Sequence, residues 1–386
     1  MKVNILAGTR FHSGLVVNIL SKLKYEVNIY SSSPKNRWNF KHPKYVKLYF
    51  VPLLSAIVSA FTKKAQGAFF KESSAVIFDI LSSVIMKKSD ILHAWSSFGL
   101  YSIIQAKKNG TTIFIEKSCP HPYYQDKLLK EESEILGVPF EEHSQWFLNR
   151  VIREFELADK VVVCSNYTLN SFIENGFPKD KLYNVALDSN FIPKRNYNRD
   201  YNNEEFVVGS AGGNIIRKGF LYLLQAWKEI DIPNKKLLLK TSKKELQQIS
   251  KIWNLIDGDD TIEIIGYLDD MEDFYERCDL FVLLSIDEGF GMVVFEALGC
   301  SLPVIITKNV GAGDFITEAK DGYIIDIRNS NQIKEKINFL SNNRNILKSM
   351  SIEAKKTFDN YKTRDDNYEN RVNQLYKQDK VDINVR

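Results

Sequence analysis

The stretch Asp279–Pro303, DLFVLLSIDEGFGMVVFEALGCSLP, predicts how the chain folds. It begins with an unbroken apolar run, residues 280–284, which is typical of a strand buried on both faces. A polar turn with two glycines follows, and from Met292 the apolar spacing is helical until Gly299. Another apolar run, residues 304–306, comes next. Strand, glycine turn, helix and strand form a βαβ unit, which binds ligands at the turn outside the strand's carboxyl end.

Two glutamates bracket the glycine turn: Glu288 precedes the glycines and Glu296 lies inside the short helix. Free N–H groups at a helix start suit a phosphate or sugar oxygen, whereas carboxylates suit hydroxyl groups. Taken singly, either glutamate could be a solvated surface residue. The whole arrangement instead favours a site for a sugar diphosphate.

The same stretch resembles the signature of retaining GT-B glycosyltransferases of family four, in which a second glutamate comes seven intervening residues after the first. The resemblance implies an α/β protein of two Rossmann-like, doubly wound domains that face a cleft. It also implies that Glu288 contacts the donor sugar, as a catalytic residue, and that Glu296 contacts the ribose hydroxyls. The turn amides would serve the sugar and the distal phosphate; they belong to Gly289, Phe290, Gly291, Met292 and Val293.

A second glycine loop, Ser210–Gly219, follows a predicted strand at residues 206–209. Amides and cations in such a loop suit a diphosphate. Its Lys218–Gly219 pair matches the family's Lys-Gly, but Ser210 stands where the family usually has an arginine, and Arg217 is the candidate substitute. The donor-binding candidates of this loop are Gly213, Arg217 and Lys218, and the last two are also catalytic candidates.

Three further stretches complete the site that the resemblance implies. Tyr267 and Leu268 match the stretch whose backbone meets the nucleobase. His121 follows a predicted strand and is the catalytic candidate beside the transferred sugar; its flanking prolines favour an extended loop. A lone histidine is also often a polar surface residue. The first loop would face the acceptor through Arg10, His12 and Gly14, with a plain surface loop as the alternative.

Composition sets wider limits. The 386 residues are enough for two domains, and 44% hydrophobic with 26% charged residues is ordinary for a globular protein. The net charge of +4 permits contact with an anionic surface, but no basic run indicates nucleic acid binding. Four scattered cysteines indicate reduced thiols and a cytoplasmic location. We expect no signal peptide, and no apolar stretch reaches the roughly twenty residues of a membrane span.

The polar run at residues 194–205 predicts a linker. We therefore expect an acceptor-side domain at residues 1–200 and a nucleotide-sugar domain at residues 201–355. By resemblance, a helical segment at residues 356–386 crosses back to the first domain, with one helix from Tyr361 to Tyr376.

Basic and aromatic residues alternate within residues 35–71. One interpretation places this segment on an anionic membrane surface, and the other makes it a core helix with solvated lysines.

The sequence thus predicts a retaining glycosyltransferase that needs no metal or other cofactor. It would move a sugar from a UDP- or GDP-sugar to a saccharide or lipid-linked saccharide, in cell-surface polysaccharide or glycoconjugate synthesis. The basic and aromatic segment would allow the protein to dock at the inner face of the membrane. The alternatives are a catalytically degenerate GT-B sugar-binding protein, or a phosphorylase or epimerase on the same fold.

Overall fold

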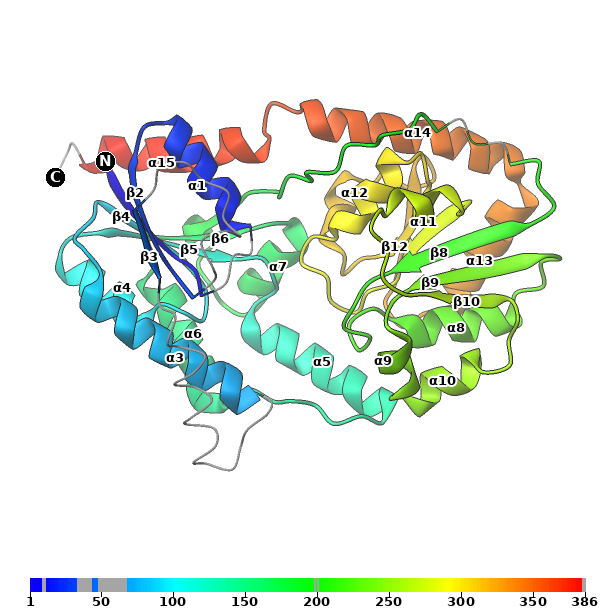
Figure 1. Cartoon of the computed structure of the whole chain (residues 1–386), viewed down its shortest axis with the longest axis horizontal. Coiled ribbons are helices and arrows are strands. Elements are labelled where there is room, and N and C mark those ends of the chain that lie inside the picture. The colour runs from blue at the N-terminus through cyan, green and yellow to red at the C-terminus, as the bar shows by residue number, and fades with distance from the viewer. Residues whose placement is uncertain (9–11, 33–43, 48–67, 198, 200, 384–386) are drawn as a thin grey trace.

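The computed structural model describes residues 1–8, 12–32, 44–47, 68–197, 199 and 201–383, and it contains two parallel sheets flanked by helices (Figure 1). The first sheet has the strand order β3-β2-β1-β4-β5-β6-β7, and the second has the order β10-β9-β8-β11-β12-β13. In each sheet the order reverses beside the first strand, which is the switch point where doubly wound folds bind ligands. The predicted α/β class with two doubly wound domains is confirmed.

The strands of the first sheet come from the N-terminal half of the chain. Its strands are β1 Lys2–Leu6, β2 Glu26–Ser31, β3 Lys44–Lys47, β4 Ile91–Trp95, β5 Thr112–Lys117, β6 Lys160–Val163 and β7 Leu182–Asn184. The helices are α1 Ser13–Lys22, α3 Ala68–Ile85, α4 Leu100–Lys108, α5 Pro122–Leu136, α6 Gln145–Leu157 and α7 Asn166–Glu174. Strand β4 is buried along its whole length, as expected of a central strand covered on both faces.

The basic and aromatic segment at residues 35–71 is described only in part. Lys44–Lys47 pair with β2 as a parallel strand, which neither of the two interpretations predicted. Residues 68–71 begin α3. The rest of the segment lies outside the described residues, so membrane contact there stays a prediction.

The second sheet begins after the linker. Its strands are β8 Phe206–Ala211, β9 Lys235–Lys240, β10 Ile262–Ile265, β11 Leu280–Leu283, β12 Val304–Thr307 and β13 Gly322–Ile325. The helices are α8 Phe220–Glu229, α9 Lys243–Gln247, α10 Ser250–Ile256, α11 Glu272–Glu276, α12 Met292–Gly299 and α13 Ser330–Asn342, with a 3-10 turn η3 at Gly311–Phe315. Residues on the two faces of this sheet pack into two separate apolar clusters, so helices cover both sides.

The C-terminal segment crosses from the second domain to the first, where α15 lies along α1 (Figure 1). The predicted single helix from Tyr361 to Tyr376 is wrong, because α14 Arg344–Thr363 ends before α15 Tyr368–Ile383 begins. Arg364 is extended and bonds to the Tyr361 carbonyl and, at 2.8 Å, to Asp188. The Asn367 side chain then accepts an N–H of the first turn of α15. The contacts of Arg364 and the cap by Asn367 both favour an end of α14 and a new start at α15.

Candidate functional site

The predicted turn forms between β11 and α12. Gly291 is the residue before α12 and has a φ of 92°, a conformation that glycine adopts without strain. No side chain caps the start of α12. Its first N–H groups are therefore available to an oxygen of a ligand.

A cavity of about 670 Å³ opens at the carboxyl ends of β8, β9 and β10 and along α12. Four predicted donor-binding residues line it: Gly213, Tyr267, Val293 and Glu296. Sequence reasoning missed Lys240, Thr241, Ser242, Lys243 and Met271, which line the same cavity. The sequence could have indicated Lys240, because this residue ends a parallel strand and such folds bind ligands at the carboxyl ends of their strands.

Glu296 faces this cavity from α12. Its carboxylate accepts a hydrogen bond of 2.8 Å from the Tyr275 hydroxyl. Burial raises the pKa of Glu296, and the bond from Tyr275 opposes that rise. Tyr275 is itself buried in the core, so the carboxylate is held by a rigid partner.

Lys218 and Glu288 form an ion pair of 2.5 Å. The lysine side chain runs over Gly212, where a Cβ atom would lie 2.9 Å from its Cδ. Gly219, with a φ of 65°, is the residue before α8. The candidate phosphate cation and the candidate sugar carboxylate therefore neutralise each other when the donor is absent.

Arg217 points elsewhere. Its guanidinium lies 3.2 Å from the Asp287 carboxylate and bonds to the Asp287 carbonyl at 3.1 Å. Burial, the largest single influence, disfavours its charge, but Asp287 and further acidic neighbours together outweigh burial, and the pKa of Arg217 is raised. Neither Arg217 nor Lys218 lines the donor cavity. The two cations differ in their partners: Lys218 pairs with Glu288 and Arg217 with Asp287. The structure therefore does not support Arg217 as the substitute for the arginine replaced by Ser210, which is itself buried.

Asp287 joins the two domains. It is fully buried, and from the first domain it accepts bonds from Tyr167 at 3.1 Å and Gln125 at 2.5 Å. Helix α5 extends this contact: Glu132 bonds to Arg328 at 2.9 Å and to Tyr222 at 3.1 Å. In Figure 1, α5 reaches from the first domain to the helices of the second.

The turn itself touches the first domain at Gly289. Its carbonyl accepts bonds from Ser165 at 2.7 Å and Cys164 at 3.3 Å. A Cβ atom at Gly289 would lie 2.8 Å from the carbonyl carbon of Ser118, so only glycine fits. Gly289 therefore sets the spacing between the domains as well as forming the turn.

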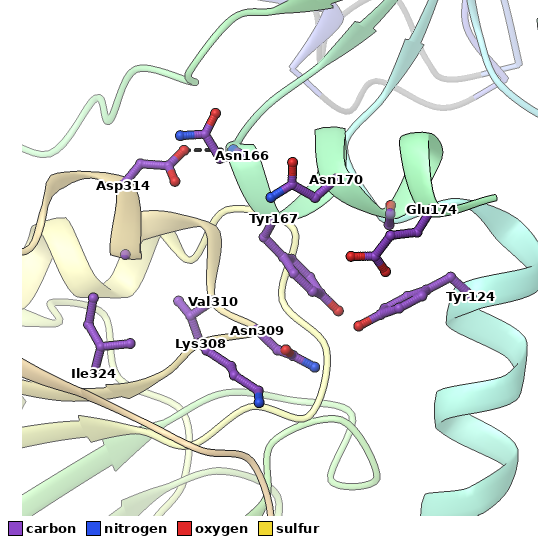
Figure 2. A pocket seen from close by; sticks show the side chains of 12 residues that line it. Tyr124, Asn166, Tyr167, Asn170, Glu174, Lys308, Asn309, Val310, Asp314 and Ile324 are labelled. Carbon is purple, nitrogen blue, oxygen red and sulfur yellow. Dashed lines mark hydrogen bonds between the residues drawn. The ribbon is translucent and has the colours of Figure 1, made fainter. Parts of the chain in front are cut away.

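A second cavity, of about 530 Å³, is lined by residues of both domains. Figure 2 shows Tyr124 and Tyr167 of the first domain across from Lys308 and Asn309 of the second. Asp314 accepts the Asn166 N–H at 2.7 Å and closes one edge (Figure 2). Among the predicted site residues that the structure describes, none lines this cavity.

His121 is buried within the first domain. Its ring packs against Phe172, with centroids 5.1 Å apart, and only 4% of the residue is exposed. Burial, aided by Lys117, lowers the pKa of His121 to about 4, so the imidazole is neutral at pH 7. This position at the start of α5 argues against the expected contact with the transferred sugar.

The acceptor-side candidates occupy different surroundings. Arg10 lies outside the described residues, and Gly14 is buried in α1. His12 pairs with the buried Glu116, whose other partners are His93 at 3.0 Å and Tyr368 of α15 at 3.3 Å. Burial alone would raise the pKa of Glu116, but the two histidines hold it at about 2. His12 thus helps to anchor α15.

Other predicted donor residues differ in exposure. Tyr267 is 87% exposed at the cavity rim, and Leu268 is half-buried beside it. Phe290 is buried and stacks on Phe295, so only its backbone can serve a ligand. Met292 is half-buried at the start of α12.

Neither a metal centre nor a membrane span is found in the described part of the chain. No group of three or more His, Cys, Asp or Glu side chains is arranged to hold a metal ion among those residues. No helix in the same residues has the length and apolar character needed to cross a bilayer.

Comparisons with known proteins agree with this architecture. The chain is 31% identical over 212 residues to the uncharacterized glycosyltransferase MJ1178 of Methanocaldococcus jannaschii, covering 51% of this chain and 54% of that protein. It is 29% identical over 189 residues to the capsular polysaccharide biosynthesis glycosyltransferase CapM of Staphylococcus aureus, covering 48% of each. The chain spans about half the length of the curated relatives it matches.

Solved structures match over almost the whole chain. The glycosyltransferase WaaG, involved in lipopolysaccharide biosynthesis, has a TM-score of 0.64 at 14% identity, covering 97% of this chain and 98% of that one. Anabaena Alr3699/HepE in complex with UDP and glucose has a TM-score of 0.60 at 15% identity, covering 98% and 99%. At such identities the likeness shows the fold alone.

Fold and cavity together define a two-domain protein of the GT-B class. Residues 194–357 match the family model of glycosyl transferases group 1.

Proposed function

We propose that the protein is a retaining glycosyltransferase that moves a sugar from a UDP- or GDP-sugar to a saccharide or lipid-linked saccharide. One observation carries this proposal: the Lys218–Glu288 pair at the glycine turn lies beside a cavity into which Glu296 projects. Cations and amides for a diphosphate thus adjoin carboxylates for hydroxyl groups. This is the chemistry that a nucleotide sugar requires.

The reaction breaks the bond between the anomeric carbon and the phosphate oxygen. Negative charge grows on the diphosphate, and Lys218 and the start of α12 are placed to stabilise it. Groups preorganised for developing charge contribute roughly a hundred- to a thousandfold in rate each. Glu288 orients the sugar hydroxyls. The acceptor oxygen bonds to the anomeric carbon on the leaving-group face, so the anomeric configuration is retained. The proton of the acceptor hydroxyl passes to the departing phosphate.

The comparisons support the proposed substrates by analogy. CapM is named for capsular polysaccharide biosynthesis, and WaaG is described as a glycosyltransferase involved in lipopolysaccharide biosynthesis. HepE was solved with UDP and glucose. We therefore propose a role in cell-surface polysaccharide or glycoconjugate synthesis, in the cytoplasm.

A panel of UDP- and GDP-sugars tests the function. One donor is expected to raise the melting temperature, because a ligand that binds only the native state stabilises it. Transfer with that donor should continue in excess EDTA and yield a product of unchanged anomeric configuration. Metal dependence would overturn the metal-free mechanism, and an inverted product would overturn retention. Binding without transfer or hydrolysis would indicate the degenerate alternative; dependence on free phosphate would indicate a phosphorylase, and an isomerised donor an epimerase.

Lys218→Ala is expected to lower kcat by about 100-fold or more, with a much smaller loss of donor affinity. The lysine is neutralised by Glu288 before the donor binds, so its net effect is greatest when charge develops on the leaving group. Steady-state kinetics and donor titration measure the two quantities. Equal losses in both would assign Lys218 to ground-state binding.

Glu296→Gln is expected to weaken donor binding by about 1.5–3 kcal/mol, the usual range for a hydrogen bond to a charged group. Calorimetry with the nucleoside diphosphate and its 2′,3′-dideoxy analogue measures the effect. Wild-type protein should prefer the ribose form, and the variant should lose this preference. Tyr275→Phe serves as a control, because it removes the partner of Glu296 and leaves the carboxylate in place. An unchanged preference in Glu296→Gln would exclude the ribose role.

A further inference from the structure

We propose that Lys240, and not Arg217, is the second cation of the diphosphate site; this inference rests on the proposed function. It assigns to a residue of β9 the charge that the family's arginine would supply from the position of Ser210. Arg217 is left with a positioning role at the contact between the domains.

The register of the sheet places Lys240 beside the glycine loop. Lys240 pairs with Ala211, the last residue of β8, and its carbonyl accepts the Gly212 N–H at 3.1 Å. Lys218 crosses the same Gly212. The backbone of Lys240 and the side chain of Lys218 therefore both contact Gly212.

Strand alternation gives the direction of the Lys240 side chain. Side chains two positions apart share a face, so Lys240 lies on the face of Leu238. Leu238 belongs to the apolar cluster that contains Val294 and Phe295 of α12. The ammonium group is thereby directed to the side of the sheet that α12 covers, where Val293 and Glu296 line the cavity.

The candidate cations differ in the groups that they pair with. Lys218 is paired with Glu288, and Arg217 is paired with Asp287. Lys243 is exposed and lies over the Trp253 ring, 5.8 Å from its centroid. None of the ion pairs found among the described residues includes Lys240, although it is half-buried in the cavity wall. A partly desolvated cation without a carboxylate is costly, and an anionic ligand removes that cost.

The positions also suggest which phosphate Lys240 contacts. Glu296, the candidate for the ribose, lines the same cavity as Lys240, whereas Lys218 and Glu288 lie at the turn expected to hold the sugar. Lys240 is therefore assigned to the phosphate next to the ribose, and Lys218 to the distal one. A nucleoside monophosphate should then be enough to detect the contribution of Lys240 to binding.

The experiment is calorimetric titration of full-length wild type, Lys240→Gln, Lys240→Arg and Arg217→Gln. The ligands are UDP, UMP and uridine, with GDP, GMP and guanosine in parallel. Lys244→Gln is the matched control, because Lys244 lies on α9, is exposed and does not line the cavity. Melting temperatures of all variants verify folding.

Lys240→Gln is expected to weaken diphosphate and monophosphate binding by about 10- to 100-fold, the range for a charge-assisted hydrogen bond. Nucleoside binding should stay within about twofold, Lys240→Arg should recover most of the loss, and Lys244→Gln should match wild type. Arg217→Gln should bind the diphosphate within about threefold of wild type.

Three results would overturn the inference: unchanged diphosphate affinity in Lys240→Gln, an equal loss for the nucleoside, or a larger loss in Arg217→Gln than in Lys240→Gln. Wild-type protein that binds neither UDP nor GDP would instead overturn the proposed function itself. The two failures are therefore distinguishable.

Discussion

Glu288→Gln is expected to lower the rate of sugar transfer by about 100-fold or more. The variant is also expected to bind free nucleoside diphosphate more tightly than wild type does. The first effect follows because the carboxylate is assigned to orient the donor sugar, and loss of one preorganised group costs about that much. The second follows because the variant frees Lys218 from an ion pair of 2.5 Å. A partly exposed pair is worth about 1 kcal/mol, or about fivefold in affinity.

A double-mutant cycle checks the second effect. In a Lys218→Met background, Glu288→Gln should no longer tighten diphosphate binding, because the lysine that it releases is absent. Stopped-time transfer assays and calorimetry provide the two readouts. Parallel losses of transfer and of diphosphate affinity in the single variant would show that the ion pair does not compete with the donor.

Gly289→Ala is expected to reduce kcat by about 100-fold with less than about a threefold change in nucleoside diphosphate affinity. The new methyl group would meet the backbone of Ser118 and Cys119, which no rotamer change can relieve. Either the turn or the neighbouring domain must shift, and a displacement of about 1 Å at a reacting centre costs on the order of a hundredfold. The cavity is lined by α12 and by residues at and after the carboxyl ends of β8, β9 and β10, all in the second domain, so nucleotide binding should survive.

Gly313→Ala is the matched control for this variant. Gly313 also lies at the contact between the domains, but a Cβ atom there would meet only Ile306 and Ile324 at 3.7 Å, an ordinary contact distance. It should keep wild-type kcat. Wild-type turnover in Gly289→Ala would show that the close approach of the domains plays no part in transfer.

Both predictions concern residues that the sequence already marks, yet their partners are visible only in the structure. The motif assigns Glu288 to the sugar, but its pairing with Lys218 joins positions 70 residues apart. The sequence pattern makes Gly289 a turn residue, and its contact with Ser118 lies in the other domain. The spacing of a motif predicts the local structure of one segment, but it does not predict which distant residues pack against that segment.

Arg217 and His121 do not have the surroundings that were expected of them, and the reason is the same for both. Sequence reasoning assigns Arg217 to the phosphates because it adjoins Lys218, whereas buried Asp287 holds it at the contact between the domains. The resemblance implies that His121 contacts the sugar, but its ring packs against Phe172 in the core. In each case a buried partner, distant in sequence, decides the direction of the side chain.

The sequence by itself determined the strand β11, the glycine turn and the helix that starts at Met292, because apolar periodicity and glycine positions act over a few residues. The two doubly wound domains were implied by the resemblance of this stretch to a known family, and the structure confirms them. The sequence also placed Glu296 and Lys218 on the correct elements. Only the tertiary structure decided which cations face the donor cavity and which join the domains. That choice depends on the register of β8 against β9 and on carboxylates brought together from distant segments, and neither leaves a local pattern in the chain.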